Sequence, residues 1–283
     1  MNYRHAFHAG NFADVLKHAV LVALLRQLQR RPKPLCYLET HAGAGLFRLD
    51  AAEARRSGEA AGGIRRLQGL APASPALAAY LRLVRALPGN EDGIRCYPGS
   101  PLVAASLLGA ADRLVLAELV PAAAEALRRL FRGNARVAVH CRDGWEALGA
   151  LLPPEPRRGL LLIDPPYEAP DDFDRVVSGL ELAHRRWPVG VLAAWYPVKD
   201  RRALRAFIRR VAAAPLGAGG VLAAELSVRP DDNPAGLNGS GMLIVGPPWG
   251  LEEALRPLLD EAWEAMREPA APRPRLEWLR RPA

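Results

Sequence analysis

The residues best suited to chemistry lie where an apolar segment ends at an acid, two prolines and an aromatic ring. Leu160 to Ile163 has the pattern of a buried strand, and it is followed by Asp164, Pro165, Pro166 and Tyr167. Open α/β sheets bind their ligands at the carboxyl ends of such strands. Asp164 can accept a hydrogen bond from an amine, and Tyr167 offers a face for a planar ring. The segment therefore suits an extruded nucleobase, although Asp-Pro-Pro also forms ordinary turns.

Small residues follow the first predicted strand. This strand covers Leu35 to Glu39, and the turn from Thr40 to Gly45 comes directly after it. Glycines at a strand end allow a ligand to approach the backbone closely, as in dinucleotide-binding turns. The turn is shorter than the full dinucleotide fingerprint, so it indicates a ligand site only in combination with the residues at the other strand ends.

Two acids mark the ends of the next predicted strands. Arg113 to Leu119 contains Glu118, at the position where Rossmann-like folds bind ribose hydroxyls. Arg136 to His140 is followed by Asp143, which can bind an adenine amine or cap the next helix. A helix-capping role before Pro121 is the alternative for Glu118.

Alternating strands and helices predict an α/β fold, with a mostly parallel sheet covered on both faces. Residues 46–95 interrupt this rhythm with two helical patterns, at about 51–68 and 75–87, and show no strand pattern. We therefore expect a Rossmann-like domain from residues 1–45 and 96–283, and a small inserted helical subdomain from 46–95. Arginines of the insert either face RNA or form a solvated surface: Arg55, Arg56, Arg65, Arg66, Arg82 and Arg85.

Local signals place several further elements. Asn11 is expected to cap a helix, and Ser100 is expected to cap another that begins with Pro101. Strands at 221–228 and 242–245 are expected to form an antiparallel hairpin at the sheet edge. A helix from Leu251 to about Met266 is followed by a proline-rich tail.

Composition indicates a globular protein with an anionic partner. The 283 residues are 50% hydrophobic and carry a net charge of +8, which suits a nucleic acid. The excess of arginine beside alanine, glycine and proline can also reflect genomic base composition. No apolar run could span a membrane and no signal peptide is evident, so we expect a cytoplasmic protein. Cys36, Cys96 and Cys141 lack metal-ligand spacing, and no metal is expected.

The order of these features resembles a class I methyltransferase that uses S-adenosyl-L-methionine. A closer resemblance is to the RlmJ family, bacterial enzymes that methylate the N6 amine of an adenine in 23S ribosomal RNA. His41 stands where many methyltransferases have an aromatic residue, and it fits the narrower family. The segments that carry the resemblance are Tyr3 to His18, Thr40 to Gly45, Tyr97 to Pro101, Leu162 to Glu168, Val177 to Gly179, Trp195 to Pro197, Ser240 to Met242 and Pro247 to Trp249.

The resemblance implies specific roles for several residues. Asp164 is implied to accept the adenine amine beside Pro165 and Tyr167, and Tyr3 to touch the RNA. The residues implied to line the cofactor pocket are His18, His41, Ser100, Glu118, Asp143, Gly144 and Asp164, with Lys17 as a neighbouring candidate.

The resulting hypothesis is N6 methylation of a specific adenine in 23S ribosomal RNA, on protein-free or partly assembled rRNA. We expect a monomer with no metal and no membrane partner. A DNA adenine methyltransferase, or less readily a protein glutamine methyltransferase, is an alternative within the same chemistry. A non-catalytic RNA-binding assembly factor is the alternative from another class.

Overall fold

A computed structural model describes residues 5–231, 233 and 236–283. Its strands are β1 (Cys36–Glu39), β2 (Leu46–Arg48), β3 (Cys96–Pro98), β4 (Arg113–Glu118), β5 (Val137–Cys141), β6 (Gly159–Ile163), β7 (Val191–Val198), β8 (Val221–Ser227), β9 (Gly239–Val245) and β10 (Arg275–Arg280). Eight of them form one sheet in the order β10-β8-β9-β7-β6-β1-β4-β5, and β2 pairs with β3 in a separate ribbon.

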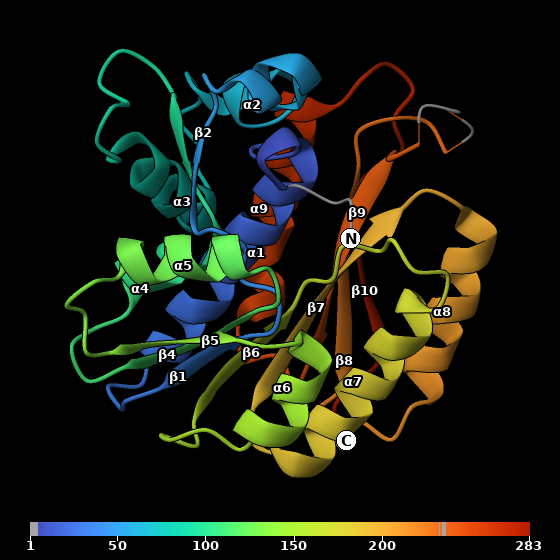
Figure 1. Ribbon diagram of the computed structural model, residues 1–283. Helices are drawn as coiled ribbons and strands as arrows, with labels where there is room; N and C mark the ends of the chain where they lie inside the picture. The colour runs from blue at the N-terminus through green and yellow to red at the C-terminus, as the bar shows by residue number, and fades with distance from the viewer. Residues whose placement is uncertain (1–4, 232, 234–235) are drawn as a thin grey trace.

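Helices cover both faces of this sheet (Figure 1). They are α1 (Phe12–Gln29), α2 (Ala52–Ser57), α3 (Pro75–Arg85), α4 (Ser100–Leu107), α5 (Pro121–Leu130), α6 (Gly144–Leu151), α7 (Asp172–Arg186), α8 (Arg201–Ala213) and α9 (Leu251–Met266), with 3-10 helices η1 (His5–Phe7), η2 (Glu59–Gly62) and η3 (Ile64–Leu67). One core contains α1, α3, α5 and α9, and a second core on the other face contains α6, α7 and α8. In the part of the chain that the structure describes, no helix is long and apolar enough to cross a membrane.

The parallel half of the sheet fixes where the predicted residues meet. β1 pairs in parallel with β4 and β6, β4 with β5, and β6 with β7. The carboxyl ends of these strands therefore lie at one edge, where open α/β sheets bind ligands. The prediction of a mostly parallel α/β sheet with helices on both faces is confirmed.

The antiparallel half differs from the prediction. β8 and β9 do pair with each other in antiparallel fashion, but β9 also pairs with β7, so this hairpin lies inside the sheet. The edge is β10, which pairs with β8 and was not predicted from the proline-rich tail. The expected edge hairpin was therefore wrong. Proline comes directly before β10 and again two residues after it, but the six residues of the strand contain none, so their N–H groups are free to pair.

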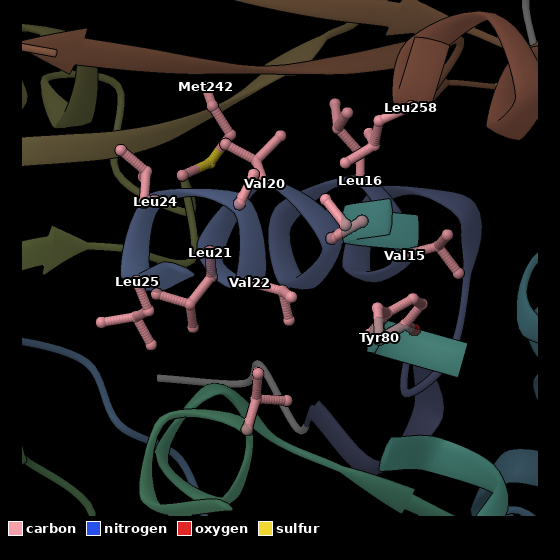
Figure 2. Packing of buried hydrophobic residues seen from close by; sticks show 14 of the residues in the cluster. Val15, Leu16, Val20, Leu21, Val22, Leu24, Leu25, Tyr80, Met242 and Leu258 are labelled. Carbon is pink, nitrogen blue, oxygen red and sulfur yellow. The ribbon is translucent and has the colours of Figure 1, made fainter. Parts of the chain in front are cut away.

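Helix α1 lies at the centre of the larger core. Asn11 caps it as predicted, accepting a hydrogen bond from the Asp14 N–H at 2.9 Å. Fifteen of its 18 residues are buried, so the helix is enclosed on all sides rather than on one face. Figure 2 shows Met242 of β9, Leu258 of α9 and Tyr80 of α3 around its apolar side chains.

Residues 46–95 contain shorter elements than predicted. The expected helix at 51–68 was wrong, because α2 ends at Gly58 with φ +66° and η2 and η3 follow instead. A Cβ at Gly63 would lie 2.2 Å from the Gly10 carbonyl oxygen, so no residue with a side chain fits at position 63 without a backbone shift. The short strand β2 was missed, whereas α3 lies within the predicted 75–87. The segment packs on α1 and α9, and its separation as a subdomain stays a prediction.

Truncating α1 tests its place in the core. Leu21 is fully buried, so we expect Leu21→Ala to lower the free energy of unfolding by about 2–5 kcal/mol. Arg26 is exposed on the same helix, and Arg26→Ala should change the value by less than about 0.5 kcal/mol. Urea unfolding followed by circular dichroism measures both. Equal losses in the two variants would contradict the central position of α1.

Candidate functional site

A cavity of about 1320 Å³ lies at the carboxyl ends of the parallel strands. Every predicted site residue that the structure describes lines it, whereas Tyr3 falls outside the described residues. The fold thus brings together residues from the ends of five strands and from α1. The predicted residues in its wall are Lys17, His18, His41, Ser100, Glu118, Asp143, Gly144, Asp164, Pro165 and Tyr167.

Glu118 and the glycine turn are held together by a backbone hydrogen bond. Gly43, with φ +63°, donates its N–H to Glu118 Oε2 at 2.7 Å, and Val120 donates to Oε1 at the same distance. Each carboxylate oxygen keeps a further lone pair for a hydroxyl donor. Glu118 ends β4 and lies in the cavity wall, so it can accept hydrogen bonds from a pair of ribose hydroxyls.

Asp143 and Gly144 form the start of α6. Asp143 caps the helix, since its side chain accepts hydrogen bonds from the N–H groups of Trp145 and Glu146 at 2.7 and 3.2 Å. A Cβ at Gly144 would lie 2.3 Å from the Thr40 carbonyl oxygen, so any larger residue would force β1 and α6 apart. The predicted capping role of Asp143 is confirmed.

Ser100 was expected to cap α4, and this was wrong. The structure places Gly99 at the cap position, and Ser100 is the first helical residue. Its hydroxyl instead donates a hydrogen bond to Glu39 Oε1 at 2.5 Å, and Tyr37 donates to Glu39 Oε2 at 2.8 Å. The extended backbone of Gly99 (φ −75°, ψ 167°) places the cap one residue earlier, so among the described residues the Ser100 hydroxyl accepts no hydrogen bond from an N–H of the helix. Burial raises the pKa of Glu39 to about 8, against the opposing effect of these hydrogen bonds.

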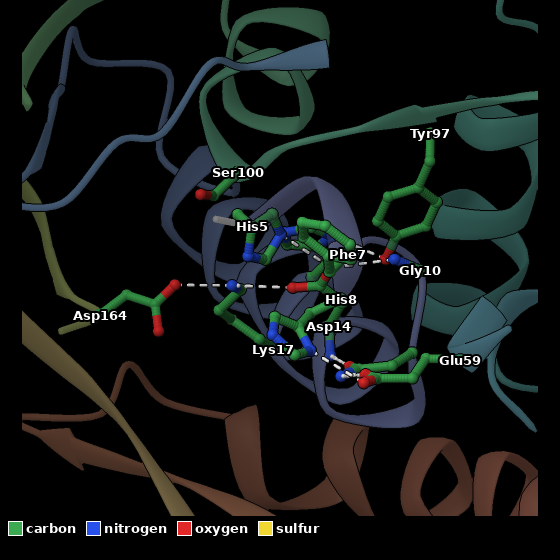
Figure 3. Close-up of polar contacts among 12 residues, drawn as sticks. His5, Phe7, His8, Gly10, Asp14, Lys17, Glu59, Tyr97, Ser100 and Asp164 are labelled. Carbon is green, nitrogen blue, oxygen red and sulfur yellow. Dashed lines mark hydrogen bonds and ion pairs between the residues drawn. The ribbon is translucent and has the colours of Figure 1, made fainter. Parts of the chain in front are cut away.

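A chain of charged groups crosses the cavity floor (Figure 3). Lys17 Nζ lies 2.6 Å from Asp164 Oδ2 and 3.0 Å from Asp14 Oδ1. His5 Nε2 and the Gly10 N–H each lie 3.0 Å from Asp14 Oδ2. Although burial opposes its charged form, His5 and Lys17 hold the pKa of Asp14 well below its usual range.

The Lys17 contact leaves one side of Asp164 for a ligand. Its other oxygen, Oδ1, forms no hydrogen bond within the described residues. The side chain of Asp164 is 14% exposed and that of Lys17 is 6% exposed, so the pair is only slightly accessible from the cavity. Asp164 can therefore accept a hydrogen bond from an amine while Lys17 holds the other oxygen.

Tyr167 is fixed by an aromatic cluster. Its hydroxyl donates to the Trp195 carbonyl oxygen at 2.6 Å, and its ring centroid lies 5.0 Å from Phe173 and 5.5 Å from Trp195. Tyr167 also has φ +52°, a conformation that costs a bulky residue about 1–3 kcal/mol. Surrounding contacts must hold this strained position, which is a common feature of ligand sites.

Two cavity histidines are neutral at physiological pH. Burial lowers the pKa of His18 to about 3. Burial likewise lowers the pKa of His41 to about 4, although the charges of Asp164 and Asp143 oppose the shift. Both rings can donate or accept hydrogen bonds without bringing a charge into the cavity.

Sequence reasoning missed four residues that shape the site. No role was predicted for Asp14, and Glu39 was predicted only as the last residue of a strand. An acid immediately before a glycine turn was the available signal for Glu39. Trp195 belongs to a segment that carries the resemblance, but no local signal indicated that it and Phe173 contact Tyr167, which they reach from β7 and α7. Among the described residues, no group of three or more His, Cys, Asp and Glu side chains could hold a metal ion.

Comparison with known proteins identifies the family. The model for the family described as "Ribosomal RNA large subunit methyltransferase D, RlmJ" matches residues 32–280. The chain belongs to the RlmJ family. Proteins named ribosomal RNA large subunit methyltransferase J from Haemophilus influenzae and Escherichia coli are 41% and 43% identical to it. These matches cover 92% of this chain in both cases, and 92% and 91% of the two relatives.

A solved structure shares the fold over nearly the whole chain. The crystal structure of protein LPL1258 from Legionella pneumophila has a TM-score of 0.85 and 32% identity, covering 96% of this chain and 98% of that one. The predicted family, the enzyme class of rRNA methyltransferase and the class I methyltransferase fold are confirmed. S-adenosyl-L-methionine is the cofactor of this RlmJ-family protein.

The unusual ionisation of Glu39 predicts a pH-dependent stability. The folded protein keeps a proton on Glu39 up to about pH 8, whereas an exposed glutamate loses it near 4.5. This contribution to stability is therefore present below pH 4.5 and is lost as the pH rises towards 8. In the wild type, the free energy of unfolding should therefore fall by up to about 4 kcal/mol between pH 5 and 8 because of Glu39. Glu39→Gln cannot titrate, and we expect this part of the fall to be absent. Urea unfolding at several pH values compares the two proteins, and parallel curves would contradict a buried, protonated Glu39.

Proposed function

We propose that this protein transfers a methyl group to the exocyclic N6 amine of a specific adenine in 23S ribosomal RNA. The observation that carries the proposal is the position of Asp164. Its carboxylate faces the cavity beside Pro165 and Tyr167, with Lys17 on one oxygen and the other oxygen available to an amine. An adenine amine is a planar, hydrogen-bond-donating group of the kind that this arrangement accepts.

The cavity residues also suit the cofactor. Glu118 is placed to accept the ribose hydroxyls, and Asp143 and Gly144 provide a close backbone surface for the adenine ring. His18, His41 and Ser100 complete the wall. S-adenosyl-L-methionine supplies an electrophilic methyl group when bound, and the protein contributes binding and orientation.

Asp164 and the Pro165 carbonyl orient the target amine. The nitrogen is a weak nucleophile because its lone pair is delocalised into the ring. Hydrogen bonds from its two N–H groups favour a more tetrahedral nitrogen, with the lone pair directed at the methyl group. The amine becomes acidic only after it has been methylated, so its proton can leave to Asp164 or water after transfer.

Lys17 and Tyr167 keep Asp164 and the base in place. Lys17 balances the charge of the nearly buried carboxylate and fixes its rotamer through a 2.6 Å ion pair. Tyr167 is immobilised by Trp195 and Phe173, so a base stacked on it has a defined angle. Positioning of this kind supplies much of the rate enhancement for a reaction between two bound groups.

The segment 46–95 is an inserted helical subdomain at the RNA entrance, beside the domain formed by 1–45 and 96–283. Ser57, Glu59 and Gly62 bring it to the cavity wall. Four exposed arginines on it form no side-chain hydrogen bond among the described residues: Arg55, Arg56, Arg65 and Arg82. Together with the net charge of +8, they support phosphate binding. The protein acts as a cytoplasmic monomer, and Tyr3 contacts the RNA.

Methyl transfer to unmodified 23S rRNA transcript tests the function. We expect N6-methyladenosine from the wild type, and at least a 100-fold lower rate from Asp164→Ala because the amine loses its acceptor. Labelled S-adenosyl-L-methionine and nucleoside analysis of the product provide the measurement. Asp174→Ala removes a carboxylate that is 64% exposed on α7, and its rate should match the wild type.

The outcomes separate the alternatives. Labelled DNA or protein, with no labelled RNA, would assign the chain to a different methyl acceptor. Cofactor binding without transfer to any of these acceptors would favour a non-catalytic assembly factor. An Asp164→Ala rate equal to that of the wild type would remove Asp164 from the proposed mechanism.

Accessibility of the adenine decides which form of rRNA reacts. Drawing a base into the cavity costs a few kcal/mol of pairing and stacking, and assembled ribosomal proteins add further restraint. We therefore expect protein-free 23S rRNA to react faster than intact large subunits under single-turnover conditions. Equal or faster methylation of intact subunits would overturn this preference.

A further inference from the structure

His18 presents an unsatisfied nitrogen in the cavity wall. The residue is fully buried on α1, and its Nε2 has no hydrogen-bond partner among the described residues. A buried polar nitrogen without a partner is costly, so such groups in a ligand cavity are usually satisfied by the ligand. What His18 can bind depends on whether Nε2 carries a hydrogen, because the neutral ring donates from one nitrogen and accepts at the other.

Two buried tyrosines form a chain behind the other nitrogen of His18. Tyr97 Oη lies 3.0 Å from His18 Nδ1, and Tyr80 Oη lies 2.9 Å from Tyr97 Oη. All three residues are fully buried, and their rings also pack against one another. Tyr97 belongs to β3, whereas Tyr80 belongs to α3 within residues 46–95 (Figure 3 shows Tyr97).

Counting hydrogens gives this chain a direction. Within the described residues, Tyr97 is the only hydrogen-bond partner of the Tyr80 hydroxyl. If Tyr97 donated to Tyr80, the Tyr80 hydrogen would be buried without an acceptor, at a cost of about 1–3 kcal/mol. Tyr80 therefore donates to Tyr97, and Tyr97 donates to His18 Nδ1. The hydrogen of the neutral ring then lies on Nε2, the nitrogen of this cavity-lining residue that has no partner among the described residues.

The tautomer selects among the charged groups of the cofactor. An Nε2–H donor binds a carboxylate, whereas a bare Nε2 would bind an ammonium group instead. Ser100, in the same wall, begins α4, and the partial positive charge at a helix start favours an anion. Among the described residues its own N–H is the first-turn donor left for a ligand, because Pro101 has no N–H and Leu102 donates to the Gly99 carbonyl oxygen. Nearby Glu39 is hydrogen-bonded and holds its proton near neutral pH, so it does not repel an anion.

We infer that Tyr80 and Tyr97 are positioning residues that fix His18 as the Nε2–H tautomer, which binds the carboxylate of S-adenosyl-L-methionine. The inference rests on the proposed function only for the identity of the cofactor. The segment 46–95 thus contributes to cofactor binding through Tyr80, in addition to any contact with RNA. Its hydroxyl acts at a distance, through Tyr97 and then His18.

Calorimetry with two cofactors tests the inference. Decarboxylated S-adenosylmethionine lacks the carboxylate and keeps the remaining groups. We expect Tyr97→Phe to weaken binding of S-adenosyl-L-methionine about two- to tenfold, the loss of one net hydrogen bond, and to leave the decarboxylated analogue unchanged. Tyr80→Phe should have the same selectivity with a smaller effect. Tyr196→Phe removes a buried hydroxyl outside the cavity and should change neither affinity.

Nitrogen NMR of histidine-labelled protein reads the tautomer directly. The chain has 6 histidines, and His18→Gln assigns the signal. We expect the Nε2–H form in the wild type and a mixture of tautomers in Tyr97→Phe. An Nδ1–H ring in the wild type, or equal weakening of both cofactors by Tyr97→Phe, would overturn the inference. Suppose that Tyr97→Phe weakens binding of S-adenosyl-L-methionine alone, but the wild-type protein does not methylate rRNA. The inference about His18 would then stand, and the proposed substrate would be rejected.

Discussion

The ion pair between Lys17 and Asp164, which has little access to water, is the interaction on which the site depends. Removing one partner of a fully buried pair typically costs about 3–5 kcal/mol, and a smaller loss is expected here because the Asp164 side chain is 14% exposed. Lys17 is held beside Asp164 by α1, which turns Lys17 and His18 to the cavity and packs its other faces in the core. The packing of α1 on β9, α3 and α9 therefore helps to fix the position of Asp164, although these elements do not contact its carboxylate.

The same helix joins the two ligand subsites. Lys17 faces the proposed amine acceptor, and the adjacent residue, His18, faces the proposed cofactor carboxylate. A rotation of α1 would displace both contacts together. Its anchors are the Asn11 cap, the Asp14 contacts with His5 and Gly10, and the packing of residues 46–95. Cofactor and substrate are thus positioned by one rigid element rather than by independent loops.

The sequence predicted what depends on local pattern. Strand ends, the Asn11 and Asp143 caps and the positions of Glu118, Asp164 and Tyr167 followed from apolar segments and the residues after them. The cavity roles of His18, His41 and Ser100 came from the family resemblance. The Lys17–Asp164 pair joins residues far apart in the chain, and no local pattern specifies it. The helix expected at 51–68 stops after Ser57, where Gly58 adopts φ +66°, and the chain then passes too close to the backbone of Gly10 for a side chain at Gly63. β10 was missed because the prolines on either side of it indicate an irregular tail, whereas its pairing with β8 is a tertiary contact.

The enclosure of α1 also constrains how the chain folds. Its apolar surface is completed by α3, then by β9 and α9, which are synthesised much later. Until those elements pair, much of the apolar surface of this 18-residue helix lacks its final packing. Contacts of such long sequence separation form slowly, and exposed apolar surface aggregates readily. We therefore expect the fold to be completed only after β9 and α9 have been synthesised.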